Sequence, residues 1–175
     1  MNIKNAVAII TGAAGGIGRE LGLELARRQA KGVAMVDKSD AVIEAAEAVN
    51  QKVGRPVAVG FSGDVTNTKF RKMVFAETRA QFGMVNICVP AAGITRDSLA
   101  VKVDKQTGEV VVYPEELFRL VMEVNLVAPV YWAVELVAGI AEHRAKLGLK
   151  RWEPDAEPLQ GAIVFIGSVS SLGNR

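Results

Sequence analysis

The sequence contains very few of the side chains that most often form disulfides or bind metal ions. Its 175 residues include one cysteine, Cys88, and one histidine, His143. No disulfide can form within the chain, and one Cys with one His cannot make a zinc site, so we expect no metal. Cys88 lies in an apolar run and is interpreted as a small core residue. A single thiol fits a reducing compartment.

The sequence also lacks a strong excess of charge and a long uncharged apolar stretch. The formal net charge is +2, and Lys and Arg are spread along the chain, which argues against a nucleic-acid partner. No charge-free apolar run has the length of a transmembrane helix, and residues 1–5 lack the features of a secretory signal. We therefore expect a soluble, cytoplasmic protein that binds neither nucleic acid nor a membrane.

Five short apolar runs recur along the chain, separated by longer segments. Within most runs the apolar residues are consecutive and do not alternate, which is typical of strands covered on both faces in a parallel sheet. The runs are residues 7–10, 33–36, 57–59, 85–89 and 163–166. Strands alternating with helices predict an α/β fold in one domain over residues 1–175. The expected architecture is a Rossmann-like, doubly wound parallel sheet, truncated after its fifth strand.

The segments between the runs have the periodicity and the end signals of helices. A third helix is predicted from a cap at Thr66–Asn67 to Gly83, and a longer fourth helix from Pro114 to about Gly148. Residues 94–113 interrupt the regular spacing and are predicted to contain a small hairpin. In the first two helices the apolar residues share one face, namely Ile17, Leu21 and Leu25, and then Val42, Ala45, Ala46 and Val49.

A glycine-rich segment with the spacing G-x-x-x-G-x-G lies between the first strand and the first helix. Gly12 permits a sharp turn, and Gly16 and Gly18 let the backbone approach a pyrophosphate. The N–H groups and the dipole of the following helix favour phosphate groups. The alternative interpretation is a tight turn that binds no ligand. The residues predicted to hold a dinucleotide cofactor here are Gly12, Ala14, Gly15, Gly16, Ile17 and Gly18.

An acidic residue, Asp37, ends the second strand, nineteen positions after Gly18. At this place a carboxylate accepts hydrogen bonds from the hydroxyls of the adenosine ribose. A 2′-phosphate would meet like charge there, so NAD is favoured over NADP. Lys38, which follows directly, keeps NADP open as the alternative. The other interpretation of Asp37 is a solvated acid at the end of a strand.

These residues and the motifs that follow resemble the short-chain dehydrogenase/reductase family, over nearly the whole chain. The Gly63–Val65 segment is similar to the family's adenine contact, which implies roles for the side chain of Asp64 and the backbone of Val65. Pro90 replaces an asparagine that ties the central strands together in the family. The resemblance implies further cofactor contacts at the residues after this proline, Ala91, Ala92 and Gly93.

The same resemblance implies two catalytic residues. Asn125 matches the family's active-site asparagine, and Ser168 matches the serine whose hydroxyl polarises and orients the substrate oxygen. Pro129 adds an argument from geometry, because its missing N–H leaves the carbonyl of Asn125 without a helical partner and free to hold a water. The family's proton relay uses a water at that carbonyl. The alternative is a simple proline kink.

The family's catalytic tyrosine, followed four residues later by a lysine, is not found in this chain. Tyr113 and Tyr131 have no lysine four positions on, and the chain ends at Arg175, seven residues after Ser168. In the family the tyrosine gives or takes a proton while a hydride moves between nicotinamide and an alcohol or carbonyl carbon. We therefore expect the amino-terminal part of a longer NAD(P)-dependent enzyme, with negligible dehydrogenase activity by itself.

The substrate class and two other functions stay open. The Gly93–Leu99 segment resembles 3-oxoacyl-(acyl carrier protein) reductases, and the two long loops resemble type 2 3-hydroxyacyl-CoA dehydrogenases. Both favour a 3-oxoacyl or 3-hydroxyacyl thioester, with a different secondary alcohol as the alternative. The family also implies a homodimer or homotetramer for the full-length enzyme.

Two other functions stay open besides the oxidoreductase. One is a non-catalytic dinucleotide-binding or regulatory module. The other is a nucleotide-binding α/β domain of another class, such as a methyltransferase or a P-loop protein, although the loop lacks the Gly-Lys-Ser/Thr ending of a P-loop.

Overall fold

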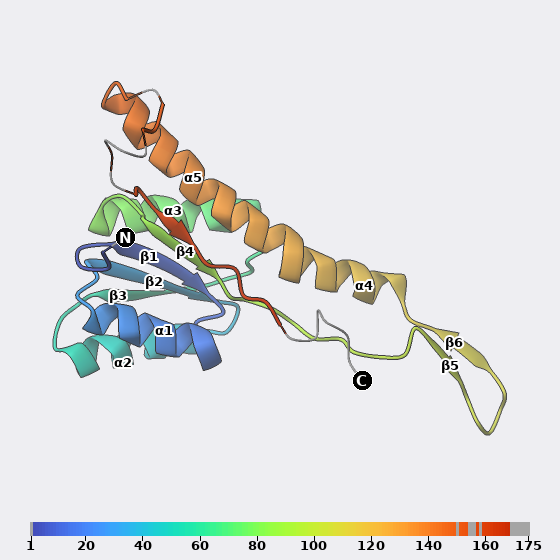
Figure 1. The fold of residues 1–175 in the computed structure, drawn as a ribbon. Helices are drawn as coiled ribbons and strands as arrows, with labels where there is room; N and C mark the ends of the chain where they lie inside the picture. Colours follow the sequence, from blue (N-terminus) through green and yellow to red (C-terminus); the bar gives the residue numbers. More distant parts are fainter. Residues whose placement is uncertain (1, 150, 154–156, 158, 169–175) are drawn as a thin grey trace.

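The computed structural model describes residues 2–149, 151–153, 157 and 159–168, which contain a parallel sheet of five strands. The strand order is β3-β2-β1-β4-β7, and each strand is parallel to its neighbours (Figure 1). Because β4 joins the far side of β1 from β2 and β3, the winding direction reverses between β1 and β4. The predicted α/β fold with a doubly wound sheet is confirmed. The strands are β1 (Val7–Thr11), β2 (Gly32–Asp37), β3 (Ala58–Ser62), β4 (Ile87–Pro90) and β7 (Ala162–Ile163).

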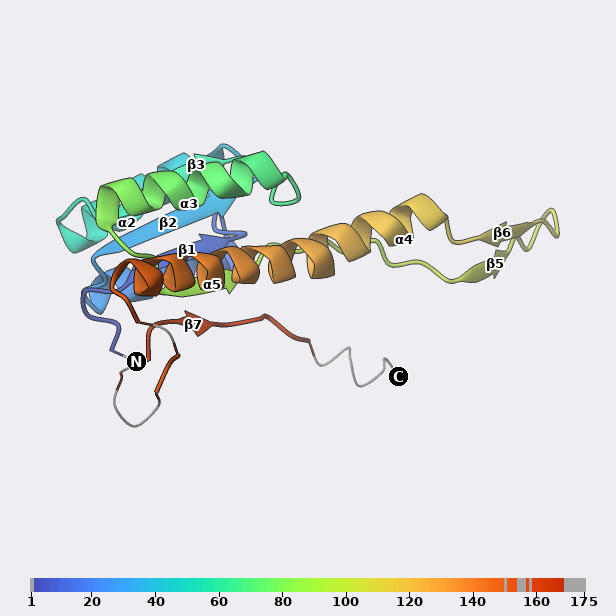
Figure 2. The ribbon, with the colours of Figure 1, turned by 90° about the horizontal axis from the view of Figure 1, so that it is seen from above.

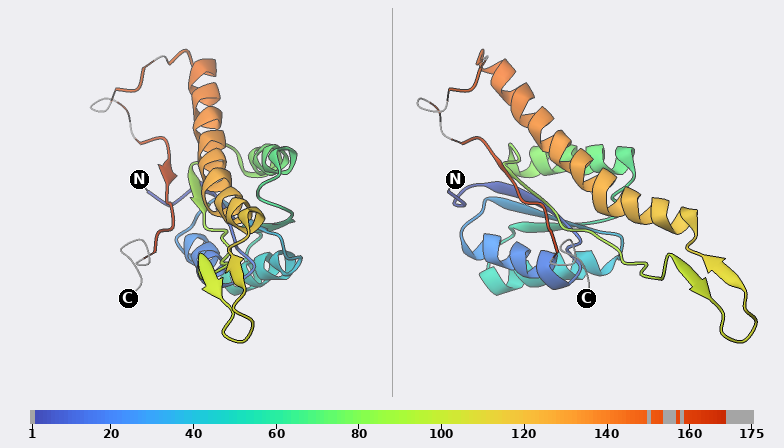
Figure 3. Two further views of the ribbon diagram at one scale, coloured as in Figure 1. Left: turned by 90° about the vertical axis from the view of Figure 1, so that its right-hand side faces the viewer. Right: turned by 45° about the vertical axis from the view of Figure 1, so that its right-hand side comes forward.

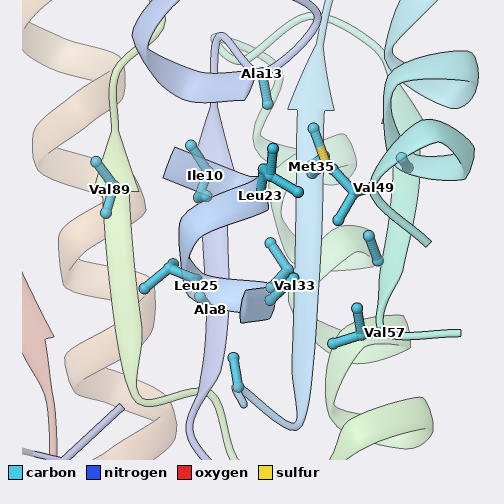
Figure 4. Packing of buried hydrophobic residues seen from close by; sticks show 14 of the residues in the cluster. Ala8, Ile10, Ala13, Leu23, Leu25, Val33, Met35, Val49, Val57 and Val89 are labelled. Atoms are coloured by element: carbon cyan, nitrogen blue, oxygen red, sulfur yellow. The ribbon is translucent and has the colours of Figure 1, made fainter. Parts of the chain in front are cut away.

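Helices cover both faces of this sheet. α1 (Gly16–Arg27) and α2 (Ala41–Val53) lie on one face, and α3 (Thr68–Phe82) and α5 (Ala128–Lys146) lie on the other (Figures 1 and 2). Successive side chains of a strand point to opposite faces. Ala8 and Ile10 therefore join the buried cluster under α1 and α2 (Figure 4), whereas Val7 and Ile9 join the cluster under α3 and α5. This burial on both faces explains why the apolar residues of the strands are consecutive.

The predicted ends of α3 are confirmed by its caps. The side-chain oxygen of Asn67 accepts the N–H groups of Lys69 and Phe70, at 2.9 and 3.1 Å. Gly83 follows the last turn with φ 95°. The cap satisfies two N–H groups that an α-helix leaves without a partner.

The long fourth helix is continuous from Glu115 to Lys146, but it is not α-helical throughout. α4 (Glu115–Met122) passes into a π-helical turn, η1 (Glu123–Val127), and then into α5. The N–H of Ala128 donates to the carbonyl of Glu123, five residues earlier. Pro129 follows directly and has no N–H with which to close an α-helical bond. The irregularity predicted at this proline is therefore a π-helical turn.

By length and composition this continuous helix is also apolar enough to cross a bilayer. Its most apolar stretch has a mean hydropathy of 1.6, and 28% of that stretch is buried. The observation is weak, because a core helix of a soluble fold has the same composition. Trp132 and Leu136 of α5 belong to the buried cluster under α3 and α5, and Glu135 lies 3.7 Å from the guanidinium of Arg71 in α3. One side of the helix is thus part of the protein core.

The segment between β4 and α4 contains the predicted hairpin. β5 (Val101–Val103) and β6 (Val110–Val112) pair antiparallel, and Gly108 adopts φ +74° in the connecting turn. The hairpin projects away from the sheet (Figure 3). All of its strand residues are exposed.

The fifth strand is shorter than predicted. It was expected over residues 163–166, but β7 ends at Ile163, although the N–H of Val164 still donates to the carbonyl of Cys88 at 3.1 Å. In a parallel ladder the next bond would run from the N–H of residue 90 to the carbonyl of Val164. That residue is Pro90, which has no N–H. The proline that replaces the family's asparagine therefore ends the pairing.

Candidate functional site

Two pockets lie next to each other at the carboxyl ends of the strands, the edge at which parallel α/β sheets bind ligands. The first has a volume of about 320 Å³, and Asp37 and Asp64 contribute to its lining. The second, of about 430 Å³, lies between the end of β4 and the long helix and includes Asn125. Ala92 and Gly93 line both pockets, so the two share a wall. A further pocket of about 350 Å³ lies between α1 and α2 and not at the strand ends.

The glycine loop has a geometry that requires glycine at some positions and leaves others open. Gly12 has φ +70°, and a Cβ there would lie 2.9 Å from the carbonyl oxygen of Ala91; a Cβ on Gly18 would overlap the carbonyl oxygen of Gly12. At Gly15 and Gly16 a Cβ would meet nothing within 4 Å, although the φ of +52° at Gly16 still favours glycine. No described side chain caps α1, so the N–H groups of residues 16–18 have no acceptor among the described residues. This arrangement fits a pyrophosphate.

Asp37 lies against the glycine loop, as predicted. The N–H of Ala14 donates to its Oδ2 at 3.0 Å, and the N–H of Ser39 donates to its Oδ1 at 3.0 Å. These bonds hold the carboxylate at the first pocket, which Gly12 also lines. The first of these bonds uses the N–H of Ala14, a residue predicted to contact the cofactor. The N–H groups of residues 16–18 remain for phosphate.

Asp64 and Val65 line the same pocket from the loop after β3. The Oδ1 of Asp64 accepts both the hydroxyl and the N–H of Thr66, at 2.7 and 2.9 Å, and the Nζ of Lys38 lies 3.3 Å from Oδ2. The bonds from Thr66, and to a smaller extent Lys38, hold the pKa of Asp64 below its ordinary value. Lys38, which kept NADP open, is therefore paired with Asp64, although its side chain is 81% exposed.

Asn125 joins the long helix to the wall between the two pockets. Its Oδ1 accepts the N–H of Ile94 at 2.8 Å, and its Nδ2 donates to the carbonyl of Ile94 at 2.8 Å. A Cβ on the preceding Gly93 would lie 3.5 Å from the same Oδ1. The side chain of Asn125 is thus occupied by the backbone and holds the Gly93–Ile94 segment against η1.

The remaining predicted catalytic residue is not brought to these pockets. Ser168 is exposed and lies beyond β7 at the end of the described segment. Phe165 and Ile166 line the second pocket, but Ser168 does not. Of the two tyrosines, Tyr113 donates its hydroxyl to the carbonyl of Arg96 at 2.7 Å. The structure therefore gathers the cofactor-side residues and Asn125, and leaves Ser168 apart.

Comparison with known proteins agrees with this geometry. Residues 6–174 match the family model of the short chain dehydrogenases. The chain belongs to the short-chain dehydrogenase family. A 3-oxoacyl-[acyl-carrier-protein] reductase of Vibrio cholerae is 29% identical over 175 residues, which cover 99% of this chain and 59% of that protein. The human 3-hydroxyacyl-CoA dehydrogenase type-2 (Homo sapiens) is 30% identical over 172 residues, 98% of this chain and 59% of that protein.

Solved structures of the family share the fold. A short-chain type dehydrogenase/reductase from Mycobacterium marinum superposes with a TM-score of 0.66 at 24% identity, over 81% of this chain and 53% of that chain. The present chain thus spans between half and three fifths of the length of these relatives. The resemblance expected from the sequence, both to the family and to these two kinds of thioester enzyme, is confirmed.

Two contacts that were not predicted from the sequence hold this site together. The Oγ1 of Thr11 accepts the N–H of Ala92 at 3.0 Å and joins the ends of β1 and β4. The Nε1–H of Trp132 donates to the carbonyl of Val65 at 2.9 Å. The sequence does indicate a role for Thr11, because Thr11 is a polar residue at the end of an apolar strand, directly before Gly12. Nothing near Trp132 in the sequence indicates its partner.

Proposed function

We propose that this protein binds NAD across the two pockets and that the whole protein is an NAD-dependent oxidoreductase. The observation that carries the proposal is the contact of Asp37 with Ala14, which holds a carboxylate beside a glycine loop whose next N–H groups have no acceptor among the described residues. The pyrophosphate binds the N–H groups of residues 16–18, and the adenosine ribose hydroxyls donate to Asp37. The base enters the pocket of Asp64, and the nicotinamide enters the pocket of Asn125.

Asp37 favours NAD over NADP in this arrangement. Two backbone N–H groups hold its carboxylate in one place, and the 2′-phosphate of NADP would lie next to it. Juxtaposed like charges are unfavourable, the more so where water is partly excluded. Lys38 compensates only in part, because its ammonium already pairs with Asp64.

Calorimetric titration with NAD, NADP and S-adenosylmethionine tests the proposal. The wild-type protein should bind NAD about 10-fold or more tightly than NADP. Asp37→Asn keeps the shape and removes the charge, so this preference should fall several-fold. Asp40→Asn is the matched control, because Asp40 is an exposed neighbour whose carboxylate accepts the hydroxyl of Ser62. Equal affinity of the wild type for NAD and NADP would contradict the role of Asp37. Binding of S-adenosylmethionine alone would contradict the proposal that the cofactor is NAD and would favour a nucleotide-binding α/β domain of another class.

The reaction we propose for the whole protein is hydride transfer between nicotinamide and a secondary alcohol or ketone. The family supports the reaction class, and the names of the two relatives support a 3-oxoacyl or 3-hydroxyacyl thioester as substrate. The bound cofactor supplies the hydride chemistry. Asn125 positions the wall between the pockets. The family resemblance assigns Ser168 to orienting the substrate oxygen, which requires the whole protein to bring it to the pockets, because in this chain it lies apart from them.

An activity assay separates cofactor binding from turnover. The 175-residue chain should bind NAD and show negligible reduction of it with a 3-hydroxyacyl thioester, because no Tyr with a Lys four positions later is present. Normal turnover by this chain would refute that expectation. A longer protein that binds NAD but oxidises no secondary alcohol would instead support the non-catalytic alternative.

A further inference from the structure

A buried hydrogen bond connects the long helix to the pocket of Asp64. The indole Nε1–H of Trp132 in α5 donates to the carbonyl oxygen of Val65, at 2.9 Å. Trp132 is fully buried and packs against Phe75, with ring centroids 5.7 Å apart, and Val65 is 7% exposed. Because this hydrogen bond is buried, a carbonyl that lost the indole would leave a buried acceptor without its donor, which is costly. The bond therefore fixes the direction of the Val65 carbonyl.

The peptide group between Val65 and Thr66 is held at both of its ends. Trp132 binds its carbonyl, and its N–H, which belongs to Thr66, donates to the Oδ1 of Asp64 at 2.9 Å. The hydroxyl of Thr66 donates to the same oxygen at 2.7 Å. A peptide group is planar, so two anchored ends set the orientation of the whole plane. The backbone at Val65 is thereby fixed from its carboxyl side.

The preceding peptide group carries the N–H of Val65, and this donor has no acceptor among the described residues. It is adjacent in the chain to the carboxylate of Asp64, and both residues line the pocket. A donor next to an acceptor is the complement of adenine, which presents the N1 acceptor beside the N6 amino donor. Hypoxanthine presents the opposite pair, an N1–H donor beside a carbonyl oxygen. The orientation of the Val65 backbone therefore matters for the choice between these two bases.

We propose that Trp132 is a positioning residue for base recognition. It does not touch the ligand; it acts through Val65 and holds the N–H of Val65 toward a 6-aminopurine base and against a 6-oxopurine base. The inference rests on the proposed function, in which this pocket takes the adenosine end of NAD. It extends that function to a residue on the long helix, 67 positions away from Val65 in the sequence.

The test compares the affinities for NAD and for nicotinamide hypoxanthine dinucleotide, measured by calorimetry. The wild-type protein should prefer NAD by about 10-fold, the value of one or two hydrogen bonds. Trp132→Phe keeps an aromatic ring against Phe75 and removes the donor. In this variant the preference should fall to about 2-fold, mostly because NAD binds less tightly.

A packing control separates this role from a general loss of structure. Leu136→Ala removes a buried side chain one helical turn from Trp132, in the same cluster, and leaves the hydrogen bond to Val65 in place. It should lower stability and keep the wild-type preference between the two dinucleotides. If Trp132→Phe has the full wild-type preference, or weakens both dinucleotides equally, the inference is overturned. A wild-type protein that binds neither dinucleotide overturns the proposed cofactor binding itself, which is a different result.

A second measurement needs no change at Trp132. The chain has two tryptophans, and Trp152→Phe leaves Trp132 as the only one. Its fluorescence should change when NAD binds, because the base contacts the backbone to which the indole is bonded, and should change less with the hypoxanthine dinucleotide at saturation. Identical emission in the free and NAD-bound states would also overturn the inference.

Discussion

Two strands of this protein, β2 and β6, both contain valine but differ in environment. Val33 and Val36 of β2 are fully buried, whereas the residues of β6, Val110–Val112, are between 52% and 65% exposed. β2 lies between β1 and β3 in a sheet with helices on both faces, but β6 pairs with β5 in a separate sheet of two strands. The preference of valine for extended backbone is the same in both. Burial therefore depends on what packs against a strand and not on the strand itself.

The same difference in burial separates two parts of the candidate site. The glycine loop, Asp37 and Asp64 belong to the region from β1 to β4, whose strands and helices form one buried cluster and most of a second, which α5 completes. Asn125 and Ser168 belong to the later region, in which none of the described residues of α4 is buried and residues 163–166 are between 37% and 55% exposed. The cofactor side of the site is thus formed by the region that supplies most of the core.

Thiol reactivity should show the largest difference between the two regions. Cys88 is the only cysteine, it is fully buried in β4, and burial raises the pKa of its thiol to about 12. Alkylation at pH 8 requires opening of the sheet and should be slower than that of a free thiol by about 10³-fold or more. In Cys88→Ser combined with Val111→Cys, the hairpin thiol should react at nearly the free rate. Mass spectrometry after iodoacetamide treatment measures both, and rapid labelling of Cys88 in the folded protein would contradict a closed central sheet.

The second largest difference between the two regions should be in the stability lost when a side chain is shortened. Ile10→Ala removes a fully buried side chain of β1 and should lower the free energy of unfolding by about 2–5 kcal/mol. Val111→Ala on the hairpin should lower it by less than about 0.5 kcal/mol. Urea denaturation followed by circular dichroism gives both values. Comparable losses would mean that the hairpin is packed in solution and that the comparison does not hold.

The turns that contain Asp64 and Asp104 provide the test with the smallest expected effect, on the pH dependence of stability. Hydrogen bonds from Thr66 lower the pKa of Asp64, and those from Thr107 and Gln106 lower the pKa of Asp104 in the hairpin. A carboxyl group whose pKa is lower in the folded state stabilises the fold above its unfolded pKa, near 4, and this stabilisation is lost as the pH falls through the folded value.

In the wild type, stability falls as Asp64 is protonated below about pH 4. Asp64→Asn should therefore show a smaller fall in stability over this pH range than the wild type. The effect should be small, because the side chain of Asp64 is 44% exposed. Asp104→Asn should leave the global transition unchanged, since an exposed hairpin opens separately from the core. Thermal unfolding between about pH 2.5 and 5.5 measures both. A clear effect of Asp104→Asn would show that the hairpin and the core unfold together.

The elements that depend on neighbouring residues could be predicted from the amino-acid sequence alone. The consecutive apolar runs predicted β1 to β4, the cap at Asn67 predicted the start of α3, and the spacing of Gly12, Gly16 and Gly18 predicted the open turn before α1. The position of Asp37 at the end of β2 followed from the same pattern, because parallel strands bring their carboxyl ends to one edge. The predictions of the strands, the cap and the glycine turn use interactions within a few positions of the chain, and the prediction for Asp37 also uses the shared edge of parallel strands.

The hydrogen bonds between groups that are distant in the sequence follow from the packing of the whole fold. Asn125 and Ile94 are 31 positions apart, Trp132 and Val65 are 67 apart, and Thr11 and Ala92 are 81 apart. β7 is short because the chain brings Val164 opposite a proline, and no pattern within the run of residues 163–166 contains that information. A turn or a helix is determined by local backbone preferences, whereas a hydrogen-bond partner is determined by which elements the whole fold packs together.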